Sequence, residues 1–433
     1  MNSVNELQEK LLHKLDRINI DNFYHFSSFN YSIGYGLLKY FKQKKYFYLV
    51  IKFFFKELIN IFFINDYEII KKNNNFKFKK IVFTWGNKSN INKGFYRDNY
   101  FNKKSSDDPN LLWVVLFRGS YDKKNLEEFD NVYFIVEKKK NFIFKFFSFF
   151  KFLFNFLKIK KKNLYNFLFY FSLHNIFRLR LKNFYEKFLH EKIDFLLMPY
   201  EGQPFQSELI KQVKKKSMKS TVVGYIHSYP SFPANLLKKK NFPDKLIVSS
   251  EDQFHFFSKK VVEKDKLKLV ESLRFKRRNE KLMSNKIYLP IDFFSKREII
   301  YNFKILITKI LKDQNLFFHE ICNHPVSNDS SKHLKLIEEI KFLTNLTKQK
   351  KANNVQFSVF IGSTGSVLEA LEMGVDVYHI TEDPVLEVYS DIIWKNIKVK
   401  KLSKNIFSYK LIYKNKSIIF GSDKDKFYEC FER

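Results

Sequence analysis

The chain has 433 residues, which is enough for two domains with separate hydrophobic cores. Its hydrophobic content of 45% and charged content of 28% are ordinary for a folded protein and exclude a wholly disordered chain. The net charge of +33 suits nucleic-acid binding, but the lysines are spread along the whole chain, without a helix-turn-helix, zinc-finger or RNP pattern. We therefore expect no nucleic-acid partner.

The N-terminal segment and the cysteines favour a cytoplasmic protein. The first twenty residues have charge and helical periodicity, and they lack the apolar core and cleavage site of a secretory signal. Cys322 and Cys430 are far apart and have no metal-binding spacing. The sequence thus predicts neither a disulfide framework nor a zinc site.

Two Phe- and Lys-rich segments are inserted in the N-terminal half, at about residues 40–65 and 141–173. Lysines interrupt them too often for a segment that spans a bilayer. Taken as helices, they place Lys52 and Lys56, or Lys151 and Lys158, on a strip beside a wide aromatic face. Two interpretations stay open: a helix that lies in the interface of an anionic leaflet, and an amphipathic helix packed on the protein core.

The rest of the chain alternates apolar runs typical of buried strands with helical patterns. In the first half we expect a helix over residues 205–218 and strands at 81–85, 111–117, 195–198 and 221–226. A second series of strands is expected at 245–248, 267–270, 287–289, 317–318 and 355–361. The Lys-rich break at 238–243 therefore predicts two α/β domains, residues 1–240 and 241–433.

Loops that follow strands carry the first candidate site residues, because ligands bind open α/β sheets at the carboxyl ends of their strands. Glu201 stands after one strand and before a glycine and a helix, a position that suits a general base or an acceptor for a substrate hydroxyl. His227 ends the next strand and is a candidate acid, base or phosphate contact, although a lone histidine more often only hydrogen-bonds a loop. Arg274 follows a later strand and offers paired donors to an anion.

The segment from residue 355 to 374 is the most informative. A β-prone run leads into Gly362-Ser363-Thr364-Gly365-Ser366, and a helical pattern closed by Gly374 follows. A helix N-terminus offers unpaired N–H groups, and small hydroxylated residues let a phosphate approach them. We expect an anion-binding turn here, with His324 gripping the same phosphate from an adjacent loop. Ordinary capping, by Ser or Thr at the start and Gly374 at the end, is the alternative.

His324-Pro325 and Gly362-Ser363-Thr364-Gly365-Ser366 together resemble the HP and Ser/Thr motifs of GT-B glycosyltransferases that build bacterial surface polysaccharides. Members include CMP-sugar-dependent sialyl- and Kdo-type transferases, in which these motifs bind the nucleotide phosphate. The resemblance covers roughly residues 80 to 380. Its other segments, in order, are 85–101, 200–205, 224–228, 243–248 and 272–275.

This resemblance implies an α/β fold of two Rossmann-like domains with a cleft between them, and nucleotide binding by the second. It implies that Glu201 is the base, with His227 next in order, and that Asp98, Gln203 and Glu369 are candidate substrate contacts. The residues implied or expected to bind the nucleotide phosphate are His324, Pro325, Gly362, Ser363, Thr364, Gly365, Ser366 and Arg274. The chain has no mid-domain D-x-D motif, so no metal is expected, and no cofactor beyond the nucleotide-sugar co-substrate.

The expected function is transfer of a sugar from a nucleotide donor, CMP-activated by resemblance, to capsule, O-antigen or lipopolysaccharide. The expected partners are the nucleotide-activated sugar, a lipid-linked or lipopolysaccharide acceptor and the inner face of the plasma membrane, to which the protein binds peripherally. Two alternatives stay open. One is a CDP-glycerol-type polymer phosphotransferase, and the other is a non-catalytic glycan- or nucleotide-binding subunit of polysaccharide assembly.

Overall fold

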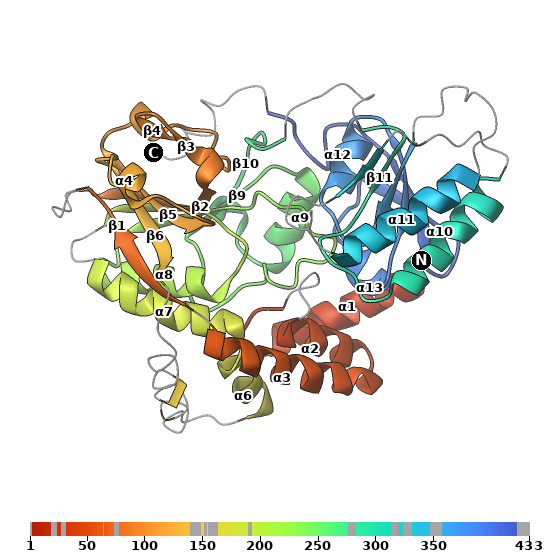
Figure 1. Cartoon of the computed structure of the whole chain (residues 1–433), viewed down its shortest axis with the longest axis horizontal. Helices are drawn as coiled ribbons and strands as arrows, with labels where there is room; N and C mark the ends of the chain where they lie inside the picture. Colours follow the sequence, from red (N-terminus) through yellow and green to blue (C-terminus); the bar gives the residue numbers. More distant parts are fainter. Residues whose placement is uncertain are drawn as a thin grey trace.

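The chain folds into two open sheets with helices on both faces, as a computed structural model shows (Figure 1). The predicted α/β class is confirmed. The residues that the structure describes are 2–18, 24–26, 32–63, 65–72, 78–138, 149–150, 154, 163–188, 193–275, 283–312, 318, 320–323, 331–346 and 357–421.

The first sheet has the strand order β1-β6-β5-β2-β7-β8-β9-β10, parallel throughout except for β1 against β6. Numbered along the chain, its seven parallel strands run 3-2-1-4-5-6-7, the doubly wound order in which ligands bind where the order reverses. That reversal lies between β2 and β7. The strands are β1 (Asp66–Ile70), β2 (Lys80–Asn87), β5 (Leu111–Arg118), β6 (Val132–Lys138), β7 (Phe195–Pro199), β8 (Thr221–Tyr225), β9 (Lys245–Val248) and β10 (Leu267–Leu269).

The second sheet has the order β12-β11-β13-β14-β16-β15. The first four strands are parallel, and β16 and β15 extend the sheet as an antiparallel pair. Here the order reverses between β11 and β13, so the carboxyl ends of these two strands are the expected binding edge. The strands are β11 (Lys286–Tyr288), β12 (Glu320–Cys322), β13 (Phe357–Ile361), β14 (Asp376–Ile380), β15 (Ile397–Lys401) and β16 (Ile406–Leu411), and a separate hairpin joins β3 (Ile91–Asn92) to β4 (Phe95–Tyr96).

Two sequence-based expectations about the strands are wrong. The sequence predicts that strands at 245–248 and 267–270 open the second domain at residue 241, but β9 pairs with β8, and β10 pairs with β9, so both belong to the first sheet. The Lys-rich break before β9 is a crossover between neighbouring strands, so the change of sheet falls between Leu269 and Lys286. The strand expected at 317–318 lies at β12 instead, and Phe318 packs its ring 5.7 Å from that of Phe357.

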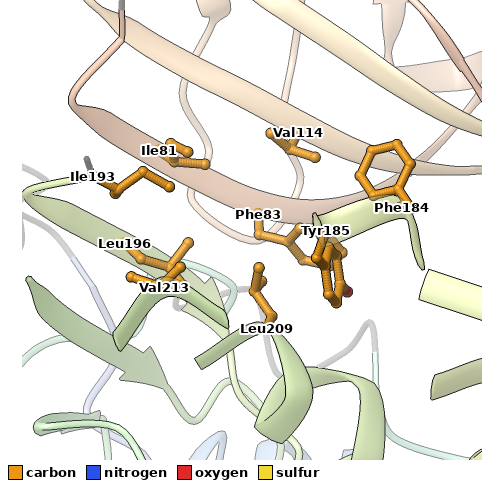
Figure 2. Close-up of a pocket in the computed structure, with 9 residues that line it drawn as sticks. All are labelled: Ile81, Phe83, Val114, Phe184, Tyr185, Ile193, Leu196, Leu209 and Val213. Carbon is orange, nitrogen blue, oxygen red and sulfur yellow. The ribbon is translucent and has the colours of Figure 1, made fainter. Parts of the chain in front are cut away.

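Helices cover both faces of each sheet because strand residues alternate between two buried sides. Along β13, Phe357 and Val359 pack with α10 and α11, whereas Phe360 packs on the side of α12. Between the first sheet and helices α7 and α8 lies an apolar void of about 10 Å³, lined by nine side chains (Figure 2), which is no larger than one water. The helices of this paragraph are α7 (Leu173–Phe188), α8 (Pro204–Lys216), α10 (Lys296–Ile305), α11 (Ser331–Leu346) and α12 (Ser366–Glu372).

The N-terminal helices bridge the two sheets. Helix α1 packs on α13, where the Gln8 amide donates to the carbonyls of Val385 (2.8 Å) and Val388 (3.2 Å). Helices α2, α3 and α6 follow along the lower edge in Figure 1. Among the described residues, no helix combines the length and apolar character needed to cross a bilayer. The remaining helices are α1 (Asn2–Arg17), α2 (Ile33–Lys42), α3 (Phe47–Phe63), α4 (Lys123–Leu126), α6 (Leu164–Tyr170), α9 (Glu251–Lys260) and α13 (Pro384–Glu387).

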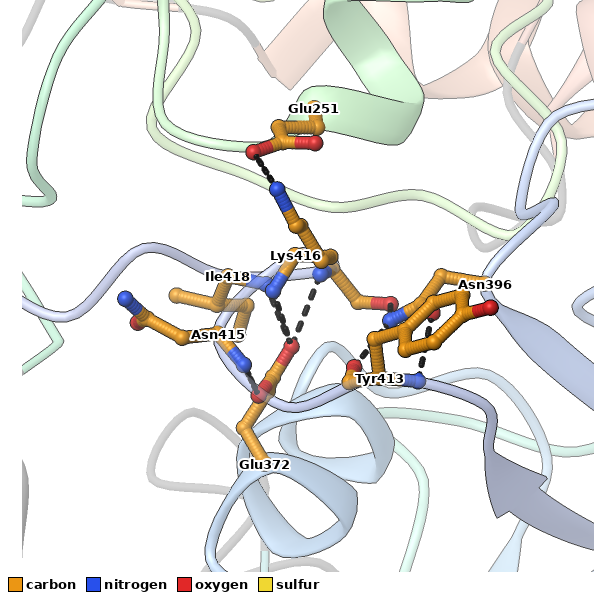
Figure 3. Close-up of polar contacts among 8 residues, drawn as sticks. Glu251, Glu372, Asn396, Tyr413, Asn415, Lys416 and Ile418 are labelled. Carbon is orange, nitrogen blue, oxygen red and sulfur yellow. Dashed lines mark hydrogen bonds and ion pairs between the residues drawn. The ribbon is translucent and has the colours of Figure 1, made fainter.

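A second bridge forms where the C-terminal segment returns to the first sheet (Figure 3). The buried carboxylate of Glu372 accepts backbone N–H groups from residues 415 to 418, with distances of 2.7 Å to Ser417 and 3.1 Å to Lys416 and Ile418. The Lys416 ammonium in turn pairs with Glu251 on α9. We call the parts of the chain that carry the first and second sheets the first and second units. One acidic side chain of the second unit, Glu372, therefore fixes the backbone of the segment that contacts the first unit.

We predict that Glu372→Ala lowers the free energy of unfolding by about 2–4 kcal/mol, because several buried N–H groups lose their acceptor. Denaturant unfolding measures the change. The exposed Glu338→Ala on α11 is the control and should stay within about 0.5 kcal/mol of wild type. Equal effects of the two variants would contradict the role given to Glu372.

Candidate functional site

Glu201 lies at the reversal of the first sheet, in the turn between β7 and α8. The buried amide of Gln206 holds this turn: its oxygen accepts the N–H of Glu201 (3.1 Å) and of Gln203 (3.0 Å), and its nitrogen donates to the Pro199 carbonyl (2.6 Å). Gly202 has φ +67°, and a Cβ there would meet the Asn235 carbonyl oxygen at 1.9 Å. Glycine is therefore required directly after Glu201.

The Glu201 carboxylate joins His227, the residue two places after β8. Its Oε1 lies 3.3 Å from His227 Nε2, and its Oε2 accepts from the Gln203 amide at 2.5 Å. The imidazole is 3% exposed and its Nδ1 is buried with no hydrogen-bond partner in the described part of the chain, whereas the Glu201 side chain is 35% exposed. Glu201 is thus the solvent-facing member of a carboxylate–histidine pair.

The electrostatic setting keeps Glu201 ionised. Burial acts to raise the pKa of its carboxyl, but the hydrogen bond and charge of His227, followed by Gln203 and Arg118, outweigh burial and leave the pKa below its ordinary value. The carboxylate is therefore ionised at neutral pH and can accept a hydrogen bond from a hydroxyl. Gln203, predicted as a substrate contact, is found orienting this carboxylate.

Asp98 does not face this site directly. It is fully buried, and burial raises the pKa of its carboxyl although four donors partly offset the effect. Those donors are the Thr84 hydroxyl (2.6 Å), the Tyr96 hydroxyl (3.0 Å) and the N–H groups of Tyr100 (2.8 Å) and Phe101 (2.7 Å). Both of its oxygens are hydrogen-bonded inside the protein, so the structure gives Asp98 a positioning role, and a contact with substrate stays a prediction. It positions Tyr100, whose ring lies 4.6 Å edge-on from that of His227.

Two arginines stand at the rim of this cluster. Burial and the charge of Glu201 raise the pKa of Tyr100 to about 12, while the charges of Arg274 and Arg118 act in the opposite direction. Both arginines are exposed, and neither forms an ion pair with a described residue. Exposed guanidinium groups that pair with no carboxylate of the described residues are suited to an anionic ligand.

The Ser/Thr turn of the second unit follows β13. Gly362 has φ +63°, and a Cβ there would come within 2.8 Å of the Pro290 side chain. Its carbonyl lies 2.6 Å from Nε2 of His379, which is fully buried on β14 with Nδ1 2.9 Å from the Tyr409 hydroxyl. Burial lowers the pKa of His379 to about 4, so a neutral imidazole fixes the turn.

The hydroxylated residues Ser363, Thr364 and Ser366 are half-buried, as is Gly365. Helix α12 has Gly365 at its N-cap position, without a side-chain cap, although the Thr364 hydroxyl accepts the Ser366 N–H at 3.4 Å. Gly374 has φ +88° and ends the helix, as ordinary capping predicts. Capping therefore accounts for the end of α12 and only in part for its start.

One loop of the first unit reaches this turn. Residues 227–231 begin with His227, and the hydroxyl of Ser231 lies 3.4 Å from that of Ser363 while donating to the Leu386 carbonyl (2.9 Å). The loop follows the carboxyl end of β8, and Ser363 follows the carboxyl end of β13. A loop at the carboxyl end of the first sheet therefore contacts a turn at the carboxyl end of the second sheet.

Tyr389 strengthens the same junction. Its fully buried hydroxyl lies 3.1 Å from the carbonyl of Tyr229 in the first unit and 2.9 Å from that of Thr364 in the second. Burial raises the pKa of this phenol far above neutrality. Tyr389 is therefore a fixed hydrogen-bond donor that holds the two loops at a constant spacing.

The other predicted residues divide into three groups. His324 and Pro325 lie outside the described residues, so their convergence with Ser363 stays a prediction. Glu369 is half-buried on α12, and its charge adds to the burial that raises the pKa of Tyr288. The charge of Arg274 acts on Tyr100 of the first unit, as described above, and the pairing of Arg274 with the Ser/Thr turn stays a prediction.

Sequence reasoning missed Gln206, Arg118, His379 and Lys239. Lys239 is buried behind the Glu201 turn and donates to the carbonyls of Gly202 and Tyr24 (3.2 Å). Within the run Lys238-Lys239-Lys240 it looks like its exposed neighbours, and no local pattern marks it. Arg118 was detectable, because it stands at the carboxyl end of a predicted strand.

Comparison with known proteins adds no assignment. No protein-family model matches the sequence, and no curated protein matches it. Function is therefore inferred from the chemistry of the site.

We predict a pH-dependent effect of Lys239→Met. Burial lowers the pKa of Lys239 to about 7, so between pH 7 and 10.5 the folded state binds fewer protons than the unfolded state. Wild-type stability should therefore rise through this window relative to the variant, by on the order of a few kcal/mol in total. Denaturant unfolding at several pH values measures the difference, and Lys240→Met, at an exposed site, should show no such trend.

Proposed function

We propose that the chain is a GT-B-type glycosyltransferase that moves a sugar from a nucleotide donor to a surface glycan at the cytoplasmic face of the membrane. The observation that carries the proposal is the 227–231 loop, which joins the Glu201–His227 pair to the Ser/Thr turn at the carboxyl ends of the two sheets. A transferase needs both parts at one junction, since one substrate supplies a hydroxyl and the other a phosphate leaving group.

The reaction follows from this division of roles. The acceptor hydroxyl, held by Glu201, attacks the anomeric carbon of the donor sugar as the bond from that carbon to the phosphate oxygen breaks. The hydroxyl proton passes to the Glu201–His227 pair, and the negative charge stays on the departing nucleotide phosphate. Hydroxyls of Ser363, Thr364 and Ser366 and nearby N–H groups stabilise that charge.

The free arginines favour substrates that carry an acidic group. CMP-activated sugars of the sialyl and Kdo type bear a carboxylate, which suits the planar donors of Arg118 and Arg274. The same arginines suit the phosphates of a polymer, and they favour a CDP-glycerol-type phosphotransferase as the second candidate. The two reactions differ in whether phosphorus is transferred with the carbon unit or leaves as the nucleoside monophosphate.

A thermal-shift panel of CMP, CDP, UDP and GDP tests the proposal, because a ligand that binds only the folded state raises its melting temperature. We expect CMP or CDP to stabilise the chain. Assays with phosphorus-labelled donor then separate CMP release from phosphate transfer. Failure of all four nucleotides to bind would remove the transferase and phosphotransferase proposals together.

We predict that Ser363→Ala lowers turnover by roughly tenfold to a thousandfold, the scale of losing one donor that stabilises developing charge. Steady-state kinetics of nucleotide release measure the change. Ser258→Ala is a matched control, since that hydroxyl only bonds the carbonyl of His255 in its own helix. Unchanged turnover in the Ser363 variant would remove the turn from the site.

We predict a different signature for Glu201→Gln. The amide keeps the size of the side chain but cannot take the acceptor proton, so transfer should fall by roughly a hundredfold or more. Nucleotide binding in the thermal-shift assay should stay within about twofold of wild type, because Glu201 lies on the acceptor side. Loss of nucleotide affinity together with turnover would contradict this division of roles.

A further inference from the structure

Helix α3 presents an apolar stripe to solvent. Tyr48, Ile51, Phe55 and Ile59 are 59%, 45%, 56% and 60% exposed, and their spacing of three to four residues places them on one face. The opposite face packs against the protein, and its buried residues include Val50, Phe53 and Ile61. This arrangement differs from a core helix, which would bury its only apolar face.

The fit of α3 against α2 shows why the stripe points outward. Gly36 on α2 allows close approach, since a Cβ there would lie 3.1 Å from the Phe53 ring and 3.2 Å from the Val50 backbone. Glu57, the only acidic residue between Lys44 and Phe63, is buried and accepts the N–H groups of Ile33 (2.8 Å) and Leu173 (2.9 Å). Both contacts fix the rotation of the helix about its axis.

The charge of the outer face is consequently of one sign. Lys52 and Lys56 are exposed beside the stripe, and Lys44 and Lys45 are exposed just before the helix begins. Glu57, the only carboxylate of α3, is buried on the inner face, so the outer face has no carboxylate beside these ammonium groups, although the charge of Lys56 still acts on Glu57. An apolar, aromatic stripe flanked by lysines alone complements a surface that is apolar inside and anionic outside.

We propose that α3 lies along the interface of an anionic lipid bilayer, with Tyr48, Ile51, Phe55 and Ile59 in the acyl boundary and Lys52 and Lys56 on lipid phosphates. At about 1.5 Å per residue, its 17 residues cover roughly 25 Å of membrane surface. Its position at the lower edge of the molecule leaves the face clear of both sheets (Figure 1). The inference goes beyond the transferase chemistry, and its failure leaves the nucleotide tests unaffected.

Vesicle sedimentation of the full chain tests the inference. We expect binding to vesicles of equal parts phosphatidylglycerol and phosphatidylcholine, and at least tenfold weaker binding to phosphatidylcholine alone. Lys52→Gln with Lys56→Gln should weaken binding to the anionic vesicles by roughly tenfold to thirtyfold. Ile51→Ser, Phe55→Ser and Ile59→Ser combined should weaken it by at least tenfold.

The matched control changes exposed apolar residues on another helix. Leu334 and Phe342 on α11 are 50% and 65% exposed, and Leu334→Ser with Phe342→Ser should leave vesicle binding unchanged. Denaturant unfolding checks that every variant is folded. Absence of binding by the wild type, or equal loss in the control, overturns the inference. So does a stripe variant that binds vesicles normally but loses self-association in sedimentation velocity, because the stripe would then join two copies.

Discussion

The buried carboxylate of Asp383 is the contact on which the placement of the two sheets most depends. It is fully enclosed just after β14, and it pairs with Lys39 and with Lys42 (2.6 Å) on α2. Burial alone would raise the pKa of this carboxyl, but the two ammonium groups outweigh burial and hold the pKa below its ordinary value. Separating a buried charge from its partners is strongly unfavourable. The ion pairs therefore hold the N-terminal helices and the second sheet in one arrangement.

That arrangement sets the electrostatics around the Ser/Thr turn. The loop after β14 carries Glu382, Asp383 and Glu387, three acidic residues next to the segment that contacts Ser231. Asp383 is neutralised by its lysines, and Glu382 caps the N–H groups of Phe294 and Ser295. Burial, with the charges of Glu382 and Asp383, raises the pKa of Glu387 to about 8, so that this group largely keeps its proton at neutral pH. This edge of the second sheet therefore carries less negative charge than its three acidic residues would give, and it repels an anion less strongly.

In the first unit, by contrast with Glu387, the carboxyl group of Glu201 is ionised. His227, the Gln203 amide and the charge of Arg118 act on Glu201, which stays charged and partly exposed. One side of the junction thus presents a proton acceptor and free cations, and the other presents hydroxyls on a turn held by a neutral histidine. The 227–231 loop connects the two sides, because it begins at His227 and its Ser231 hydroxyl lies 3.4 Å from that of Ser363. This asymmetry suits the two chemically different substrates of the proposed transferase.

Local sequence patterns predicted most of the strands and the positions of several candidate residues that follow them. Alternating apolar runs marked most of the parallel strands, and position after a strand marked Glu201, His227 and the turn at 362–366, because sheet edges follow directly from chain order. They misplaced β9 and β10, since strand pairing depends on contacts far along the chain. Sequence alone also could not separate Asp98 from Glu201, because burial decides whether a carboxylate positions the fold or meets a ligand.

The sequence by itself therefore determined the α/β character, the helix and strand segments and the turns that bear candidate groups, all of which depend on neighbours within a few residues. Only the tertiary structure decided that Lys239 is buried while Lys238 and Lys240 are not, that Ser231 meets Ser363, and that the apolar face of α3 is left in solvent. Those outcomes depend on packing between segments that lie far apart in the chain, and no local pattern encodes them.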